Sequence, residues 1–171
     1  MMIKPGRVCT AGYQGATVAE LIAALRGSGV EVLCDVRAHP VSRKPGFSKR
    51  ALAEACLAAG LHYASVPELG IPAERRRRAR TRADRDALFD AYEREILPRA
   101  ADAVGRLAGW IREGRSVALL CFEADPADCH RRRAADAVAR AAGVGVLDLR
   151  LVEADPPPRR SRPRTAACRP G

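Results

Sequence analysis

Short apolar segments typical of β-strands alternate with amphipathic helical patterns along most of this chain of 171 residues. Glycine, proline or polar residues bound each apolar segment, and the intervening segments repeat their apolar residues at the helical period. Such alternation indicates a mainly parallel sheet, since each helix crosses over between two strands. We therefore expect an α/β fold, a three-layer sandwich with a sheet of about five strands and helices on both faces. The expected strands are residues 7–10, 30–35, 61–66, 116–122 and 144–152.

A single domain is expected over residues 1–153, followed by a disordered basic tail rich in proline and arginine over residues 154–171. No apolar stretch reaches the roughly 18 residues that a membrane-spanning helix requires. The first residues do not resemble a secretory signal, so we expect a cytoplasmic protein with no membrane partner. The six cysteines form no C-x-x-C pair, which favours reduced thiols over a disulfide framework.

The formal net charge of +10 suggests a nucleic-acid partner as one alternative. Arginines gather at residues 74–82 and in the tail, where they could contact phosphates. Aromatic residues make up only 4% of the chain, so few side chains could stack on bases. The run at residues 74–82 has no apolar periodicity, and it is equally consistent with a mobile loop or a solvated helix start.

Ligands of parallel sheets bind beyond the carboxyl ends of the strands. In this chain that rule brings together four segments, namely residues 12–15, 35–47, 67–70 and 121–131. The last segment joins the most apolar strand to a helix that we expect to begin at Asp125 and Pro126, with Asp125 as its N-cap. Residues 121–131 are therefore where we expect the chemistry of the protein.

Cys121, Glu123 and His130 are the candidate catalytic residues. A thiol between a buried strand and a helix N-terminus is stabilised as the thiolate by the helix dipole. Glu123 could act as a general base, and His130 could transfer a proton because imidazole titrates near neutral pH. A buried unreactive cysteine, a solvated acid and a histidine paired to a carboxylate are the structural alternatives.

Arg37 and Arg131 are candidate ligand-binding residues, because guanidinium groups bind phosphate or carboxylate through paired hydrogen bonds. Asp35 leaves the same strand as Arg37 and points into the same crevice, and an ion pair between Asp35 and Arg37 or Arg131 is the alternative role. Gly12 and Tyr13 follow the first strand in a loop that matches a phosphate-binding loop only loosely. Tyr13 could stack on a ligand ring.

A metal site can be drawn from Cys121, Glu123, Cys129 and His130, but the expected helix argues against it. Side chains of adjacent helical residues diverge by about 100°, so Cys129 and His130 would not reach one ion together. We therefore expect no metal and no cofactor, and Cys129 is grouped with the ligand-binding residues.

Taken together, these segments resemble the family called domain of unknown function 488. The matching motifs are Thr-Ala-Gly-Tyr at residues 10–13, Asp-Val-Arg at 35–37, Pro40 with Ser42, Pro-Gly-Phe at 45–47, Pro-Glu-Leu-Gly at 67–70, and C-x-E at 121–123 followed by C-H-R at 129–131. They span about residues 7–152. The resemblance implies a small α/β domain and adds Ser42 to the ligand-binding residues, but it implies no reaction.

A weaker similarity is to rhodanese-like domains, which also place Asp-Val-Arg after an early strand and a reactive cysteine between a later strand and a helix. That similarity implies a nucleophilic Cys121. The loop that follows Cys121 departs from the rhodanese pattern, because it is acidic and contains a proline.

The sequence thus predicts binding of a small anionic or nucleotide-like ligand at the carboxyl edge of the sheet, possible catalysis by Cys121 or Glu123, and anchoring by Arg37 and Arg131. The alternatives are a nucleic-acid-associated protein that uses the arginine-rich run and tail, and a non-catalytic ligand-sensing module.

Overall fold

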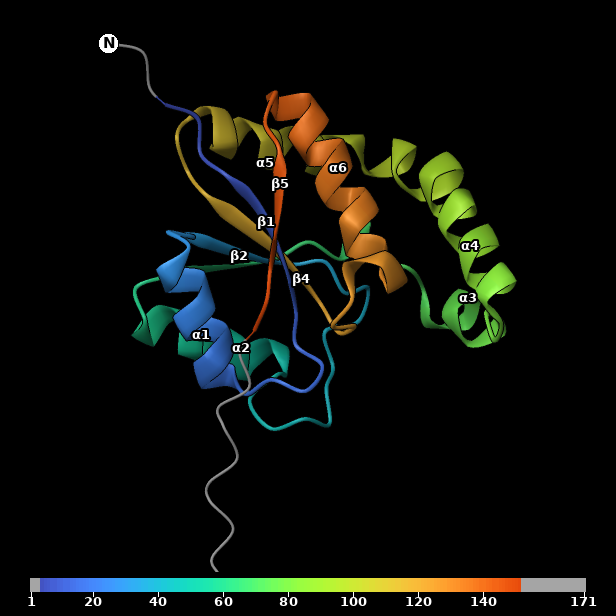
Figure 1. Cartoon of the computed structure of the whole chain (residues 1–171), viewed down its shortest axis with the longest axis horizontal. Coiled ribbons are helices and arrows are strands. Elements are labelled where there is room, and N and C mark those ends of the chain that lie inside the picture. Colours follow the sequence, from blue (N-terminus) through green and yellow to red (C-terminus); the bar gives the residue numbers. More distant parts are fainter. Residues whose placement is uncertain (1–3, 152–171) are drawn as a thin grey trace, which may run out of the picture.

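The structure, a computed structural model, describes residues 4–151. The tail expected at residues 154–171 lies outside these residues, as do the last residues of the expected domain. Within the described range, the chain forms an α/β sandwich around one parallel sheet (Figure 1). The fold class predicted from the sequence is confirmed.

The sheet has five strands in the order β3-β2-β4-β1-β5, and every neighbouring pair is parallel. The strands are β1 (Val8–Gly12), β2 (Val32–Asp35), β3 (His62–Ser65), β4 (Val117–Cys121) and β5 (Val146–Leu149). All carboxyl ends therefore lie at one edge. β4 is the central strand, which places the residues after it in the middle of that edge.

Helices cover both faces of the sheet. α1 (Val18–Gly27) and α2 (Lys49–Ala58) pack on one face, where Leu21 and Leu52 enter the core. α5 (Ala101–Arg112) and α6 (His130–Ala142) pack against each other and on the opposite face, where Leu107 and Val138 enter a second core cluster. One cluster lies between the sheet and the helices on each face, so helices, sheet and helices form the three layers of the sandwich.

β4 shows why its sequence specifies a central strand. Its side chains alternate between faces, with Leu119 in the cluster below α5 and α6 and Leu120 in the cluster below α1 and α2. All its residues are buried, as expected for a strand that is covered on both faces. Cys121, its last residue, lies on the α5–α6 side of the sheet.

The helix expected to begin at Asp125 begins later than predicted. Asp125 instead caps a single 3-10 turn, η4 (Pro126–Asp128), by accepting a hydrogen bond from the backbone N–H of Ala127 at 2.8 Å. α6 then starts at His130, and Cys129 between them has an extended backbone with φ −135° and ψ 139°. Pro126 favours the short turn, but the extended backbone of Cys129 prevents that turn from continuing into α6.

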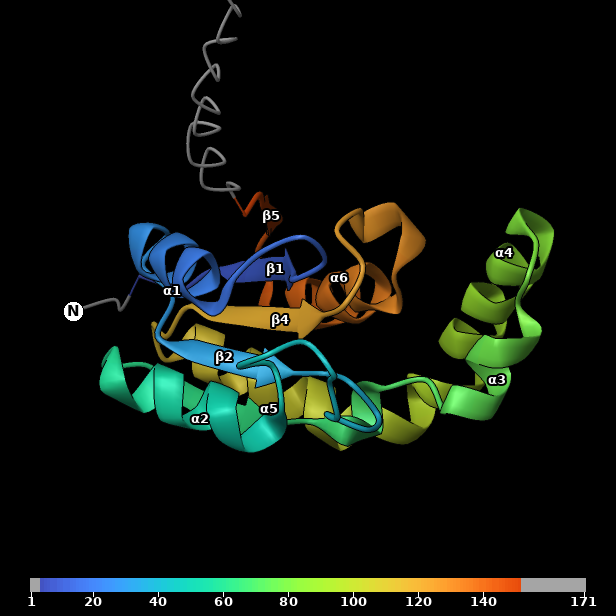
Figure 2. The same ribbon diagram turned by 90° about the horizontal axis from the view of Figure 1, so that it is seen from below.

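Most of the arginine-rich run is helical, which agrees with the solvated helix start among its two expected forms, and residues 79–81 are not helical. The run forms α3 (Ala73–Arg78) and the start of α4 (Arg82–Ala91), which together extend from the body of the domain (Figures 1 and 2). The chain returns through a π-helical turn, η2 (Tyr92–Ile96), and a 3-10 turn, η3 (Pro98–Ala100). A further 3-10 turn, η1 (Pro67–Leu69), precedes α3.

None of the helices in the described part of the chain combines the length and the apolar character needed to cross a membrane.

Gly70 allows the loop before α3 to pack closely on the loop after β2. A Cβ at residue 70 would lie 2.2 Å from the backbone nitrogen of Ala38, whereas a Cβ at Gly105 in α5 would meet nothing within 4 Å. We expect Gly70→Ala to lower the free energy of unfolding by about 1–3 kcal/mol because the two loops must separate. Gly105→Ala should raise it by about 0.5–1 kcal/mol. Urea unfolding measures both, and equal midpoints for the two variants would contradict the close packing at Gly70.

Candidate functional site

The sheet register brings the polar segments predicted from the sequence to one place. Gly12 pairs with Cys121 at the ends of β1 and β4, and Asp35 at the end of β2 pairs with Leu120. The segments that follow these three strands therefore start side by side. They form two connected groups, one around Asp35 and one around Cys121.

A buried ion pair joins Asp35 and Arg37. Arg37 Nε donates to Asp35 Oδ1 at 2.8 Å, and Arg37 Nη2 donates to Asp35 Oδ2 at 2.6 Å. The side chain of Asp35 is 0% exposed and that of Arg37 is 5% exposed. Tyr63 from β3 donates its hydroxyl to Asp35 Oδ2 at 2.6 Å. The bidentate geometry and the third donor compensate the carboxylate for its loss of water.

Arg37 also binds the loops on either side. Its Nη1 donates to the hydroxyl of Tyr13 at 2.9 Å and to the carbonyl of Phe47 at 3.0 Å. The rings of Tyr13 and Phe47 stack with their centroids 4.3 Å apart. Tyr13 is itself buried. These contacts correspond to the internal ion pair weighed as the alternative for Arg37, and they make Arg37 and Tyr13 part of the framework of the site.

Arg131 has a similar role beside Cys121. It is 1% exposed and donates from Nη1 to the carbonyl of Glu123 and from Nη2 to that of Ala124, the latter at 3.0 Å. Its Nε is buried with no hydrogen-bond partner among the described residues. Gly12 makes room for this loop, because a Cβ at residue 12 would lie 1.8 Å from the carbonyl oxygen of Glu123. Arg131 and Gly12 together fix the path of the chain after β4.

Cys121, Cys129 and His130 form a buried cluster. Their ligand atoms all lie within 4.8 Å of one another, and His130 Nδ1 is 4.0 Å from Cys121 Sγ and 3.9 Å from Cys129 Sγ. His130 Nε2 lies 3.2 Å from the carbonyl oxygen of Val36. The divergence expected of Cys129 and His130 does not occur, because Cys129 is extended and only His130 is helical.

Glu123 adds a carboxylate to this cluster. Its Oε2 accepts from Cys121 Sγ at 3.5 Å. Burial opposes ionisation of Glu123, but hydrogen bonds from the Cys129 thiol, the Glu123 backbone and the Cys121 thiol outweigh it, so the pKa of Glu123 is lowered. The pKa of Cys129 is raised well above its ordinary value, mainly by burial and then by the neighbouring Cys121. At neutral pH the cluster therefore contains an ionised acid and a protonated Cys129 thiol.

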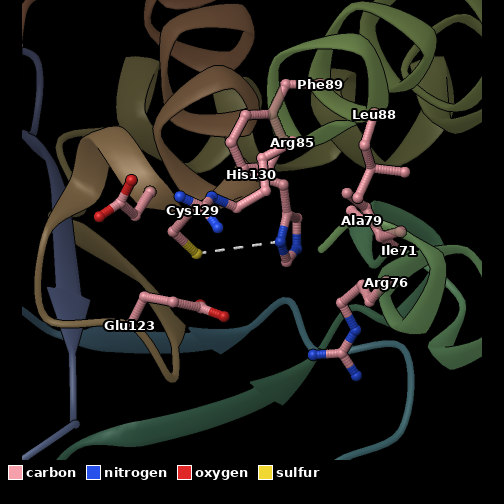
Figure 3. Close-up of a pocket in the computed structure, with 10 residues that line it drawn as sticks. Ile71, Arg76, Ala79, Arg85, Leu88, Phe89, Glu123, Cys129 and His130 are labelled. Atoms are coloured by element: carbon pink, nitrogen blue, oxygen red, sulfur yellow. Dashed lines mark hydrogen bonds between the residues drawn. The ribbon is translucent and has the colours of Figure 1, made fainter. Parts of the chain in front are cut away.

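A cavity of about 180 Å³ opens over this cluster, with Glu123, Cys129 and His130 on its wall. Figure 3 shows Glu123 and Arg76 on opposite sides of the cavity, with the contact from Cys129 to His130 between them. Arg76 comes from α3 and Arg85 from α4. Sequence reasoning missed both as individual site residues, because a run of arginines without periodicity does not reveal which one faces inward.

A second cavity, of about 240 Å³, adjoins the first through Arg76, which lines both. Cys121 lies on its wall together with His39, Ser42 and Arg43. Ser42 Oγ also accepts from the backbone N–H of Lys44 at 3.1 Å, which shapes the loop after β2. The predicted ligand-binding Ser42 thus lies on a wall shared with Cys121.

The remaining described cysteines are core residues. Cys34 and Cys56 are fully buried, and burial raises the pKa of their thiols to about 12 and about 11 respectively. Neither lines either of the two cavities. They provide matched internal controls for the thiols of the cluster.

Comparison with known proteins identifies one family. The model of the family described as Domain of unknown function DUF488 matches residues 17–138. The match includes Asp35, Arg37 and the whole segment from Cys121 to Arg131, and it begins after Gly12 and Tyr13. No curated protein and no solved structure matches the chain. The suggested similarity to rhodanese-like domains gains no support.

Tyr63→Phe tests the hydrogen bonding around Asp35. Removal of the hydroxyl that Asp35 binds should lower the free energy of unfolding by about 1–3 kcal/mol at pH 7. Burial, and then the hydrogen bond to Asp35, raises the pKa of Tyr63 above its ordinary value. The unfolded chain therefore ionises first, and the stability that Tyr63 contributes is complete below its unfolded pKa and is lost as the pH rises above that value. Urea unfolding of both proteins should show their difference shrinking above about pH 10. A constant or growing difference would contradict this assignment.

Proposed function

The chain belongs to the family described as Domain of unknown function DUF488, and because that description names no activity, we propose a function from the geometry of the sheet edge. The protein is an enzyme that binds a small anionic ligand, which can be nucleotide-like, in the two cavities that meet at Arg76. The reacting group belongs to the cluster of Cys121, Glu123, Cys129 and His130.

One observation carries this proposal, namely that cationic and nucleophilic groups share one cavity. Arg76 and Arg85 line it together with Glu123, Cys129 and His130. Other arginines of the α3–α4 arm form ion pairs, Arg75 with Glu95 and Arg77 with Glu74, whereas neither Arg76 nor Arg85 has an ion pair with a described carboxylate. A cavity with convergent polar groups and acids or thiols of shifted pKa is the usual form of a catalytic site.

The cluster can supply both a nucleophile and a proton acceptor. His130 Nδ1 faces the Cys121 thiol at 4.0 Å, a distance that can shorten when a ligand closes the site. Glu123, ionised and within 3.5 Å of the same sulfur, can accept a proton from Cys121 or from a water in the cavity. Cys121 and Glu123 are therefore the two candidates for the reacting group, with His130 as the residue that holds or moves the proton.

Arg37 and Arg131 have a different part in this proposal from the one predicted. Their guanidinium groups are engaged with Asp35 and with the loop carbonyls, so both residues position the site, and Arg37 also lines the second cavity. Anchoring of the ligand charge passes to Arg76, with Arg85 and Arg43 beside the cavities.

A cytoplasmic location is part of the proposal, because the five described cysteines are all free.

The nucleic-acid alternative has less support from the structure. Several arginines of the α3–α4 arm are ion-paired with acids of the same arm or of η2, including Arg82 with Asp86. A non-catalytic ligand-sensing module would use the same cavities. It differs from an enzyme in one respect, since its ligand would survive incubation unchanged.

Arg76→Ala tests anion binding, with inorganic phosphate as the probe. Wild-type protein should show a melting temperature that rises with phosphate at constant ionic strength, because the ligand binds only the folded state. Arg76→Ala should need at least about tenfold more phosphate for the same rise in melting temperature, which is equivalent to about 1.4 kcal/mol of binding free energy. The matched control is Arg78→Ala, since Arg78 lies on the same helix but lines neither cavity.

Two results would contradict the proposal. One is a phosphate response that is absent from the wild type and from Arg78→Ala. The other is a response that Arg76→Ala keeps at full strength, which would place the anion away from the two cavities.

A further inference from the structure

We propose that Cys121, Cys129 and His130 bind one zinc ion at the carboxyl edge of the sheet. The three residues offer two sulfurs and one imidazole nitrogen, and these atoms lie within 4.8 Å of one another. All three side chains are at most 4% exposed. The inference deepens the proposed function, because its ligands belong to the proposed reacting cluster, but it does not depend on Arg76, which anchors the anion.

The distances suit a tetrahedral ion. Bond lengths of about 2.3 Å to sulfur and about 2.1 Å to nitrogen place ligand atoms about 3.6–3.8 Å apart in a tetrahedron. His130 Nδ1 lies 4.0 Å and 3.9 Å from the two sulfurs. Since the three ligand atoms lie within 4.8 Å of one another, movements of about 1 Å or less would complete the coordination, and rotation of the two cysteine side chains can supply them.

The tautomer of His130 also suits metal binding. A carbonyl oxygen only accepts hydrogen bonds, so the 3.2 Å contact with Val36 requires Nε2 to carry the proton. The lone pair of Nδ1 is then directed at the two sulfurs. Donation from the second ring nitrogen to a backbone carbonyl is the arrangement that orients metal-binding histidines. The ring also packs edge-on against Tyr92, with centroids 5.4 Å apart.

The ligand set selects the metal. Two thiolates and an imidazole favour zinc over magnesium or calcium, which prefer oxygen ligands. Three protein ligands leave the fourth position open, as in catalytic zinc sites. Cys129 and His130 both line the cavity that Arg76 and Glu123 enclose, so the open position faces the proposed ligand. Glu123 is then the group left to move a proton, because both thiols are engaged as ligands.

The experiment uses the full chain with Cys168→Ser, so that a cysteine outside the described residues does not contribute. Reduced and chelator-treated protein is titrated with Co²⁺ and then with Zn²⁺. We expect about one equivalent of Co²⁺ to produce sulfur-to-cobalt charge-transfer absorption, which Zn²⁺ should abolish by displacement. Zinc should also protect Cys121 and Cys129, but not Cys56, from iodoacetamide under partly denaturing conditions, as measured by peptide mass spectrometry.

Loss of a group that only hydrogen-bonds to a metal ligand weakens metal binding by roughly 10–100-fold. Cys129→Ser and His130→Gln remove ligands themselves, so each should weaken Zn²⁺ binding by more than that. Cys56→Ala is the matched control, because Cys56 lies in the core cluster on the opposite face and should leave binding unchanged. Circular dichroism checks that each variant folds. If one does not, the wild-type cobalt spectrum and thiol protection still decide the question.

A cobalt titration without charge-transfer absorption, together with unchanged labelling of Cys121 and Cys129 in zinc, would overturn the metal site. Arg76→Ala should keep its zinc even where it loses phosphate binding. The metal site and the proposed function can therefore fail separately.

Discussion

The Asp35 carboxylate lies at the end of a fully buried strand, and the site depends on how the chain compensates its charge. A buried carboxylate without partners costs several kcal/mol. Arg37 and Tyr63 supply donors from the neighbouring loop and strand. Through Arg37 the same network reaches Tyr13 and Phe47. One buried charge thus connects the segments after β1 and β2 to the strand β3.

The Asp35 network also affects the cluster of Cys121, Cys129 and His130, which lies after β4 and at the start of α6. Val36, between the two members of the ion pair, presents the carbonyl that binds His130 Nε2. Arg131 donates hydrogen bonds to carbonyl groups of the loop after β4, and Gly12 allows that loop to approach β1. The position of His130 relative to Cys121 therefore follows from backbone groups that are fixed by buried arginines, not from the side chains of the cluster alone.

Much of this arrangement could be predicted from the sequence, because strand and helix periodicities differ and parallel strands end at one edge. The α/β class followed from that alternation, and the grouping of Asp35 with Cys121 followed from the edge. The geometry of Cys129 could not be predicted, since Asp125 and Pro126 are typical of a helix start and give no sign that the turn ends after three residues. Arg76 was hidden for another reason. Its role depends on how the α3–α4 arm is directed, which is a tertiary property.

The site depends on how His130 presents an unprotonated Nδ1 to the two thiols, with the ring proton held on Nε2 by the carbonyl of Val36. Long-range ¹H–¹⁵N correlation spectra of the histidine rings in labelled, metal-free protein test this most directly. His130→Gln identifies the resonances, which separates them from those of His39 and His62. We expect the His130 ring to carry a proton on Nε2 and none on Nδ1. A proton on Nδ1, in either the neutral or the charged ring, would contradict it.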